Sequence, residues 1–164
     1  MRENAESLSV VGLPGERLDS AEKVTGQAVY VSDMILPGML YAAVKRSVYA
    51  RAKIRKIDTG RAKKCPGVRA VVTGEELDYR LGLYVVDKYI LAKGEVRHYG
   101  EAVAAVAADT LEAARKAADL IDVVYEPLPP VLHPLEAFNK KAPLVHPKLG
   151  EYDYIKEVFT PVPG

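Results

Sequence analysis

The sequence predicts an α+β domain that contains strand–helix–strand units, and one continuous stretch carries most of that prediction. Residues 102–108 (AVAAVAA) are apolar throughout, which is typical of a strand buried on both faces. Residues 109–121 place apolar side chains at helical spacing, and residues 122–126 (DVVYE) return as a strand. A helix of about ten residues and a strand of about five both span roughly 15 Å, so the helix can lie along the sheet.

The helix in this unit is expected to begin at Asp109. Glu112 follows three residues later, an arrangement close to a capping box. One apolar face is formed by Leu111, Ala114, Ala118 and Ile121. Its alanines allow the helix to approach the sheet closely.

Three strands are expected in the first third of the chain. Runs of β-forming residues predict strands at 28–31 and 40–44. Residues 52–55 (AKIR) alternate between apolar and polar, which indicates a third strand. Ile57 falls off this phase, so the strand is expected to end or bend near Lys56.

A second strand–helix–strand unit continues from there. Asp58 or Thr59 can cap a short helix through a side-chain oxygen, and the Pro-Gly pair at 66–67 stops that helix. β-Branched residues predict a strand at 68–73. Residues 74–92 are ambiguous and are expected to hold a short strand pair or a loop.

The chain divides into three parts. Residues 1–16 show little periodicity and are interpreted as an extended lead, residues 17–138 form the domain, and residues 139–164 form an irregular C-terminal arm. The arm holds four prolines and two glycines among apolar and aromatic residues. It either packs against another chain or domain or wraps its own domain.

The composition excludes several classes of protein. Lys and Arg total 23 and Asp and Glu total 22, so the net charge of +1 gives no global field to recruit nucleic acid or an acidic membrane. The sequence has no apolar run long enough for a membrane helix and no apolar signal core at its start, so we expect a cytoplasmic protein. Cys65 is the single cysteine, which excludes an internal disulfide. Scarce amide residues and abundant charges are typical of a thermophilic source.

The residues contain no complete catalytic set. His98, His133 and His146 share no metal-ligand spacing with one another or with Cys65. The nucleophile elbow G-x-S-x-G, the P-loop and the dinucleotide-binding glycine motif are all missing from the sequence. We therefore assign no catalytic, cofactor-binding or metal-binding residue to this chain, and a binding, scaffold or subunit role is favoured.

The segment Tyr99-Gly100-Glu101, just before the apolar run, most resembles a site. A catalytic carboxylate would need a base, a metal or a cofactor nearby, and only His98 is close in sequence. The favoured interpretation is structural. Gly100 fits a turn where the chain needs a positive φ or has no room for a Cβ, and Glu101 is expected to be a partly exposed carboxylate that can pair with Arg97.

Three segments of the chain occur in an order typical of one family. Residues 17–47 read RLDSAEKVTGQAVYVSDMILPGMLYAAVKRS, and residues 57–77 read IDTGRAKKCPGVRAVVTGEEL. Residues 91–131 read LAKGEVRHYGEAVAAVAADTLEAARKAADLIDVVYEPLPPV. In this order the stretch from Arg17 to Ala137 resembles the N-terminal part of the molybdenum-binding large subunit in the xanthine dehydrogenase, aldehyde oxidase and carbon monoxide dehydrogenase family.

The resemblance implies a fold and a role. The fold is the α/β hammerhead, an α+β domain with a mixed sheet and two main helices. The chain would be an N-terminal domain or split subunit of a molybdenum hydroxylase-type oxidoreductase, supplying structure and interface. It would bind no cofactor alone. Molybdopterin and the catalytic glutamate would come from a remainder of the large subunit on a separate chain, with iron–sulfur and flavin subunits as further partners.

The sequence departs from the family pattern in one place. After Arg46-Ser47 the family has Pro-His-Ala-His, whereas residues 48–51 here read VYAR, so no role of those histidines is carried over. The family's catalytic glutamate also follows a glycine. Gly100-Glu101 nevertheless matches the structural motif of the family's N-terminal region, because of its place in the order of segments.

These observations leave three hypotheses open. The chain is a structural component of such an oxidoreductase, a stand-alone small-ligand binding or assembly module with the same fold, or a remnant of a truncated gene. For the first hypothesis, the candidates for structural or interface roles are Arg17, Asp19, Lys23, Gly26, Arg97, Gly100 and Glu101.

Overall fold

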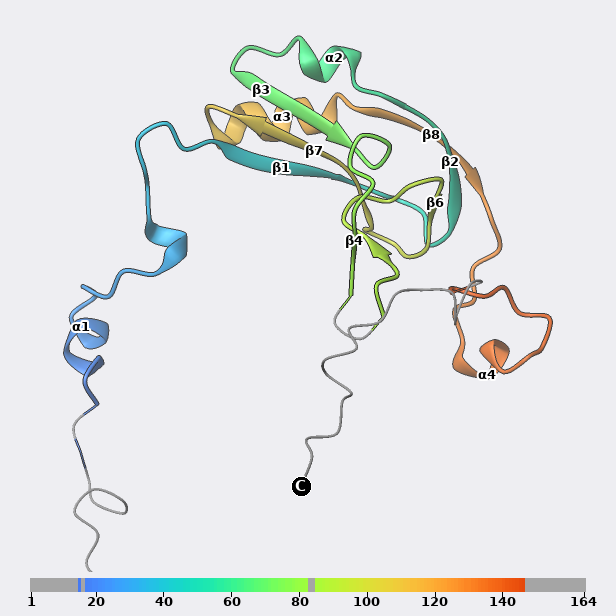
Figure 1. Cartoon of the computed structure of the whole chain (residues 1–164), viewed down its shortest axis with the longest axis horizontal. Helices are drawn as coiled ribbons and strands as arrows, with labels where there is room; N and C mark the ends of the chain where they lie inside the picture. Colours follow the sequence, from blue (N-terminus) through green and yellow to red (C-terminus); the bar gives the residue numbers. More distant parts are fainter. Residues whose placement is uncertain (1–14, 16, 83–84, 147–164) are drawn as a thin grey trace, which may run out of the picture. The chain divides into compact units, whose positions relative to one another are not determined.

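The structure is a computed structural model that describes residues 15, 17–82 and 85–146 (Figure 1). The chain divides into two compact units, residues 1–37 and residues 38–164, and each is described by itself. Apart from Gly15, the predicted lead at 1–16 lies outside the described residues, as does the predicted arm from residue 147 onward. The domain boundaries after residues 16 and 138 stay predictions.

The first unit contains two short helical elements. These are α1 (Ser20–Val24) and the 3₁₀ turn η1 (Val31–Asp33), in which the Tyr30 N–H donates to the Asp33 carboxylate at 3.0 Å. The strand expected at 28–31 is wrong. A run of β-forming residues is stable as a strand only beside a partner, and the described residues pair no strand with this segment.

In the second unit, the strand expected at 102–108 forms the centre of a three-stranded antiparallel sheet. This strand, β7 (Ala102–Ala108), pairs on one side with β1 (Tyr41–Arg46) and on the other with β3 (Val68–Thr73). The strands predicted at 40–44, 68–73 and 102–108 are thereby confirmed. Figure 1 shows β7 lying between its two neighbours.

A second antiparallel sheet has the order β6-β2-β8, and two further short strands pair with each other. The second sheet comprises β6 (Glu95–Val96), β2 (Ala52–Asp58) and β8 (Asp122–Pro127). The short pair is β4 (Arg80–Leu81) with β5 (Lys88–Tyr89), which confirms the strand-pair alternative for residues 74–92.

The α+β class is confirmed, but the expected mixed sheet is corrected, because every pairing between the described strands is antiparallel. The physical reason lies in the two strand–helix–strand units. Each helix connects strands of different sheets: α2 (Gly60–Lys63) connects β2 to β3, and α3 (Leu111–Asp119) connects β7 to β8. Neither crossover therefore places two parallel strands side by side.

The phase break predicted in the third strand is present as a bulge. The register of β2 against β8 shifts between Ile54 and Lys56, and the strand then continues to Asp58. The extra residue turns Ile57 back toward the interior, where it packs against both hydrophobic clusters. The strand therefore bends where the sequence predicts and does not end there.

The N-cap of α3 is one residue later than the predicted Asp109. Thr110 is the N-cap, and its Oγ1 accepts the Ala113 N–H at 3.1 Å. Asp109 lies outside the helix and accepts two hydrogen bonds from the Arg69 guanidinium, at 2.7 and 2.9 Å. Asp109 is thus held by β3, which leaves the cap position to the threonine.

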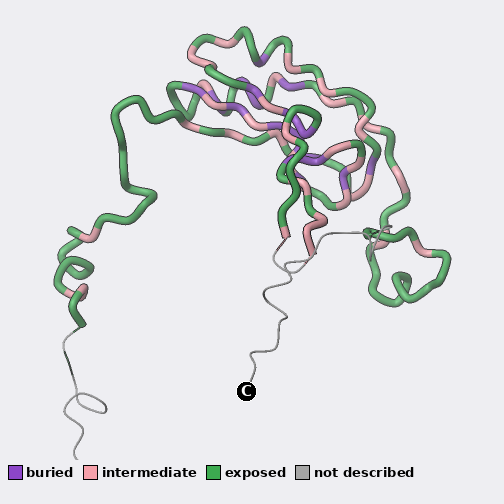
Figure 2. Tube along the Cα trace, viewed as in Figure 1, coloured by how far each residue is buried: buried purple, intermediate pink, exposed green. Residues whose placement is uncertain are grey.

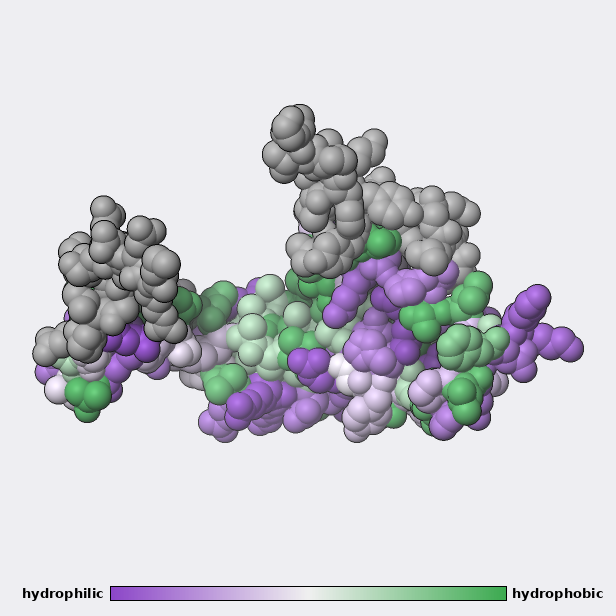
Figure 3. Space-filling model, turned by 90° about the horizontal axis from the view of Figure 1, so that it is seen from below, coloured by the Kyte–Doolittle hydropathy of each residue, from purple (hydrophilic) through white to green (hydrophobic). Residues whose placement is uncertain are grey.

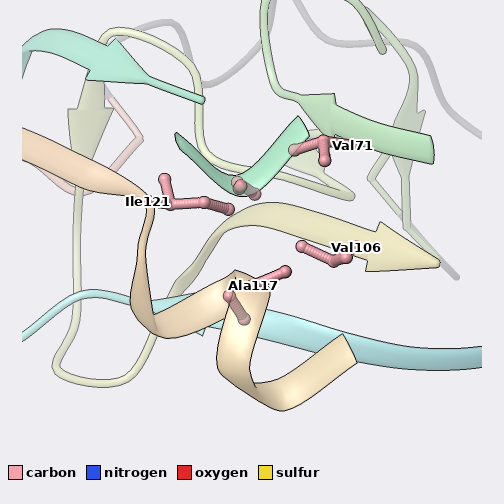
Figure 4. Packing of buried hydrophobic residues seen from close by; sticks show 7 residues of the cluster. Val71, Val106, Ala117 and Ile121 are labelled. Carbon is pink, nitrogen blue, oxygen red and sulfur yellow. The ribbon is translucent and has the colours of Figure 1, made fainter. Parts of the chain in front are cut away.

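Two hydrophobic clusters share β7 between them. One, shown in Figure 4, lies between α3 and the first sheet and includes the labelled residues Val71, Val106, Ala117 and Ile121. The other contains Ala52, Ala92, Val96 and Val103. The burial trace in Figure 2 shows the buried residues concentrated along β7 and the segments around it.

The buried face of α3 differs in two positions from the predicted one, because Ala117 replaces Leu111. Ala114, Ala117 and Ala118 are buried, whereas Leu111 is 39% exposed. Leu111 is the first residue of the helix. The last helix, α4 (Pro134–Ala137), is a single turn. Among the described residues, the helices are all too short and too polar to cross a bilayer.

Candidate functional site

The turn between β6 and β7 places Arg97, Gly100 and Glu101 in one corner. Gly100 has φ +79°, so its predicted left-handed conformation is confirmed. The Glu101 carboxylate accepts the Arg97 backbone N–H at 2.5 Å, and its other oxygen lies 3.5 Å from the Arg97 guanidinium. The predicted pairing of the two side chains is therefore present.

The exposure expected for Glu101 is corrected. The residue is 4% exposed, where a partly exposed carboxylate was predicted. A buried carboxylate is stable only with compensating donors, and Arg97 supplies both a backbone donor and a cation. The corner therefore folds around the charge of Glu101, which makes that carboxylate part of the core.

The end of β1 clamps this corner from the other side. The Ser47 N–H donates to the Glu101 carbonyl at 2.8 Å, and the Gly100 N–H donates to the Ser47 carbonyl at 2.9 Å. The Arg46 guanidinium donates to the Gly100 carbonyl at 2.9 Å. Ser47 is 2% exposed. The first sheet and the corner are thus joined by three hydrogen bonds.

Arg46 and Ser47 are functional candidates that no catalytic or binding motif of the sequence indicated. Their signal in the sequence was their place in the family-like segment 17–47. Nothing local distinguishes Ser47, because its importance comes from a backbone contact with a corner more than fifty residues away. Its hydroxyl accepts the Tyr49 N–H at 3.0 Å, which also fixes the exit from β1.

The other four candidates lie in the first unit, around α1. Asp19 pairs with Lys23 and with Arg17, each at 2.5 Å, and these two bonds, that of Lys23 first, hold the pKa of Asp19 below its ordinary value. Gly26 has φ +72° and follows the end of the helix. The cluster is exposed, so its ion pairs contribute little to stability.

Two adjacent cavities lie beside the corner in the second unit. They measure about 270 and about 420 Å³ and share the lining residues Arg51, Glu95, Arg97, Leu144 and Val145. Arg51 donates to Glu95 at 2.7 Å, so its charge is compensated within the cavity wall. The walls combine these ionic groups with apolar side chains, a composition suited to a small amphipathic molecule.

The cation at the rim of the larger cavity is also paired. Lys93 lies 3.1 Å from Asp78 and 3.9 Å from Glu75, and the bond to Asp78 is the main reason that the pKa of Lys93 is raised. Next to the second sheet, the Tyr49 and Tyr125 rings pack in a tilted arrangement with 5.2 Å between their centroids, and burial raises the pKa of Tyr125.

The three histidines have separate local partners. The Leu135 N–H donates to His133 Nδ1 at 3.2 Å at the start of α4, and His146 Nδ1 lies 2.6 Å from Asp87. His98 Nδ1 lies 3.0 Å from the Tyr99 carbonyl. Within residues 15, 17–82 and 85–146, three or more His, Cys, Asp or Glu residues nowhere gather in a way that could hold a metal ion.

The cavity walls do not fit a phosphate-bearing cofactor. Arg51 faces Glu95 and Arg97 faces Glu101, so each guanidinium that lines the larger cavity has a carboxylate beside it. A phosphate placed there would meet two negative charges together with the two positive ones. We therefore derive no chemical step through molybdopterin from these residues.

Taken together, the two antiparallel sheets and the clamped corner define a structural α+β module. Residues 25–129 match the sequence profile of the family described as "Aldehyde oxidase and xanthine dehydrogenase, a/b hammerhead domain". The chain belongs to this hammerhead family.

Relatives and solved structures agree with that assignment. The chain is 41% identical over 132 residues to a probable xanthine dehydrogenase subunit from Bacillus subtilis, covering 79% of this chain and 18% of the relative. It is 37% identical over 149 residues to the carbon monoxide dehydrogenase large chain of Afipia carboxidovorans, covering 87% and 18%. The crystal structure of a Cu,Mo-CO dehydrogenase matches with a TM-score of 0.78 at 35% identity, covering 83% of this chain and 18% of that chain.

Proposed function

We propose that this chain is the structural and interface domain of a molybdopterin-dependent oxidoreductase, and that a separate chain carries the molybdopterin-binding remainder of the large subunit. The observation that carries the proposal is the family match over residues 25–129. The chain spans less than a fifth of the two relatives described above. Oxidation chemistry is assigned to residues outside this chain, with iron–sulfur and flavin subunits as further partners and the cytoplasm as the location.

The first unit supports an interface role. None of the described side chains from residue 17 to residue 37 is buried, although many of them are apolar. Eight apolar or aromatic residues are 49% exposed or more: Leu18, Val24, Val29, Tyr30, Val31, Met34, Ile35 and Leu36. A segment that buries none of these groups in a core of its own needs a surface to cover them.

The clamped corner supports the structural half of the proposal. Glu101, Ser47 and Gly100 join the end of β1 to the start of β7 through backbone and side-chain hydrogen bonds. These groups are engaged with one another in hydrogen bonds that hold the two strands together. The seven candidate residues are accordingly proposed to act in folding and assembly.

The experiment that tests this proposal is reconstitution. The 164-residue chain is co-expressed with the polypeptide from the same genome that carries the molybdopterin-binding region. Size-exclusion chromatography with light scattering then gives the stoichiometry, and metal analysis gives the molybdenum content. We expect a stable complex that contains molybdenum. Two separate species, with the chain remaining a metal-free monomer, would overturn the proposal.

A stand-alone ligand-binding module is the second candidate, and the paired cavities favour it. Their apolar walls and internally paired ionic groups would suit a small uncharged amphipathic molecule. Calorimetric titration of the isolated chain with benzyl alcohol and hexanol tests this function. Saturable binding that Leu144→Asp abolishes, together with failure of the reconstitution, would favour the second candidate over the first.

A further inference from the structure

The two faces of the first sheet differ sharply in burial. Along β7, Ala104, Val106 and Ala108 are at most 1% exposed, and the first two pack with residues of α3 in one hydrophobic cluster. The intervening Ala105 and Ala107 point to the opposite face and are partly exposed. A central strand with one sealed face and one accessible face indicates that only one side of this sheet is covered by the described residues of the second unit.

The register extends this accessible surface across all three strands. Ala42 and Val44 of β1 lie opposite Ala107 and Ala105, and Ala70 and Val72 of β3 lie opposite the same two residues. We call the resulting surface the open sheet face, which consists of Ala42, Val44, Ala70, Val72, Ala105 and Ala107. All six side chains are small and apolar.

At the Val103 end of β7, this face of the sheet is covered by residues of the second hydrophobic cluster. Val103, the next residue of β7 on this side, is 0% exposed because it packs with Ala92 and Val96 of the second cluster. Beyond Val103 this layer ends, and Val44 is already 40% exposed. The space-filling view in Figure 3 shows apolar surface next to hydrophilic surface on one side of the molecule.

The side chains of the open sheet face decide what kind of group can cover it. Without a charged or hydrogen-bonding side chain, the face offers hydrophobic contact alone. Alanine and valine keep the surface shallow, so a helix can approach as closely as α3 approaches the other face through Ala114, Ala117 and Ala118. The fitting occupant is therefore an apolar helix face.

We propose that the open sheet face binds an apolar helix from the molybdopterin-binding remainder of the protein. In each of the two relatives described above, 82% of the chain (100 minus 18) lies outside the match, so ample chain exists to supply such a helix. The inference rests on the proposed function and adds to it the surface and the chemistry of the contact. It does not involve the clamped corner or the cavities.

The test places one charge on the open sheet face and one elsewhere. Val44→Lys adds a lysine to the edge strand β1, and Ala70→Lys adds one to the edge strand β3. The matched control is Val124→Lys on the edge strand β8, where the side chain is 54% exposed. Thermal unfolding of each purified chain first establishes that the variants are folded, and Val44→Thr replaces any lysine variant that is not.

Binding to the purified polypeptide that carries the molybdopterin-binding region is then measured by calorimetry. We expect the dissociation constant to rise about tenfold or more for Val44→Lys and Ala70→Lys, because each buries a charge in an apolar contact, and to stay near the wild-type value for Val124→Lys. If the wild-type chain binds but all variants bind equally well, the open sheet face is not the contact.

Two other outcomes have separate meanings. If the wild-type chain does not bind that polypeptide at all, the proposed function fails and this inference fails with it. If light scattering shows a dimer of the isolated chain that Val44→Lys dissociates, the occupant is a second copy of this chain, and the helix assignment is overturned.

Discussion

Arg97 contacts the Glu101 carboxylate with two groups, its backbone N–H and its guanidinium. The carboxylate of Glu101 accepts the Arg97 backbone N–H at 2.5 Å and faces the Arg97 guanidinium at 3.5 Å. Because Glu101 is 4% exposed, Arg97 compensates a buried carboxylate with one backbone hydrogen bond and one nearby guanidinium. The pair sits at the junction of the two sheets, so its loss affects both.

Replacing Glu101 is expected to destabilise the fold in proportion to what is removed. Glu101→Gln keeps an acceptor for the Arg97 N–H but removes the charge, and should lower the free energy of unfolding by about 1 kcal/mol. Glu101→Ala leaves the Arg97 backbone N–H without its acceptor and the Arg97 guanidinium without its ion-pair partner, and should cost about 3 kcal/mol. Urea denaturation followed by circular dichroism measures both, with Glu112→Gln on the exposed side of α3 as the control. Equal unfolding energies for Glu101→Gln and Glu112→Gln would contradict this account.

Substitutions at Gly100 test how much the corner depends on a left-handed backbone conformation. A Cβ at this position would meet nothing within 4 Å, so any effect of a substitution comes from the backbone at φ +79°. We expect Gly100→Ala to cost about 1–2 kcal/mol and Gly100→Asn to cost less, because asparagine tolerates the left-handed region better. The ordering of the two unfolding midpoints is the measurement, and an asparagine variant less stable than the alanine variant would refute the argument.

The N-cap of α3 offers a matched pair of threonines. Thr110 Oγ1 accepts the Ala113 N–H, whereas Thr59 occupies the N-cap of α2 without a side-chain cap bond. Thr110→Ala should therefore lower the free energy of unfolding by about 1 kcal/mol, and Thr59→Ala by much less. Chemical denaturation of the two variants side by side gives the comparison. A similar loss at both positions would show that the hydrogen bond to Ala113 is not the cause.

Glu76 is expected to contribute a pH-dependent part of the stability. The Thr73 N–H and then the Thr73 hydroxyl donate to its carboxylate and hold the pKa of Glu76 below its ordinary value of 4.5. A depressed folded-state pKa stabilises the protein above the unfolded pKa, and this contribution is lost as the pH falls through the folded pKa. The difference in unfolding free energy between wild type and Glu76→Gln should thus be largest at neutral pH and shrink below about pH 4.5.

The size of this effect is limited by solvent. The Glu76 side chain is half exposed, so the difference at neutral pH should stay below about 1 kcal/mol. Urea midpoints of both proteins at neutral pH and at about pH 3.5 supply the comparison. A difference that grows on acidification would have the wrong sign for a carboxylate stabilised in its charged form.

Local patterns predicted the elements of this fold better than their arrangement. The apolar run at 102–108 and the phase break at Ile57 identified the central strand and the bend in β2, because both patterns record which side chains are buried. The sequence did not predict which strand each strand pairs with. Whether β8 joins β7 or β2 depends on contacts between residues some seventy positions apart, which no short window contains.

The candidate site shows the same division. The left-handed glycine and the pairing of Arg97 with Glu101 follow from residues close in sequence, and both were predicted. The burial of Glu101 was missed, because it depends on the end of β1 closing over the corner through Ser47. The strand expected at 28–31 failed for the converse reason: its residues favour a strand, but no partner strand reaches them among the described residues.

The central position of β7 also sets the order in which the protein can fold during synthesis. Tyr41 of β1 pairs with Ala108, which follows it by 67 residues (108 minus 41), and β3 also waits for β7. At about 5–20 residues per second, a ribosome needs roughly 3–13 s to make that stretch. During this interval β1 and β3 have no partner strand. A nascent chain that stalls before Ala102 therefore exposes unpaired strand edges, which favour aggregation and chaperone binding.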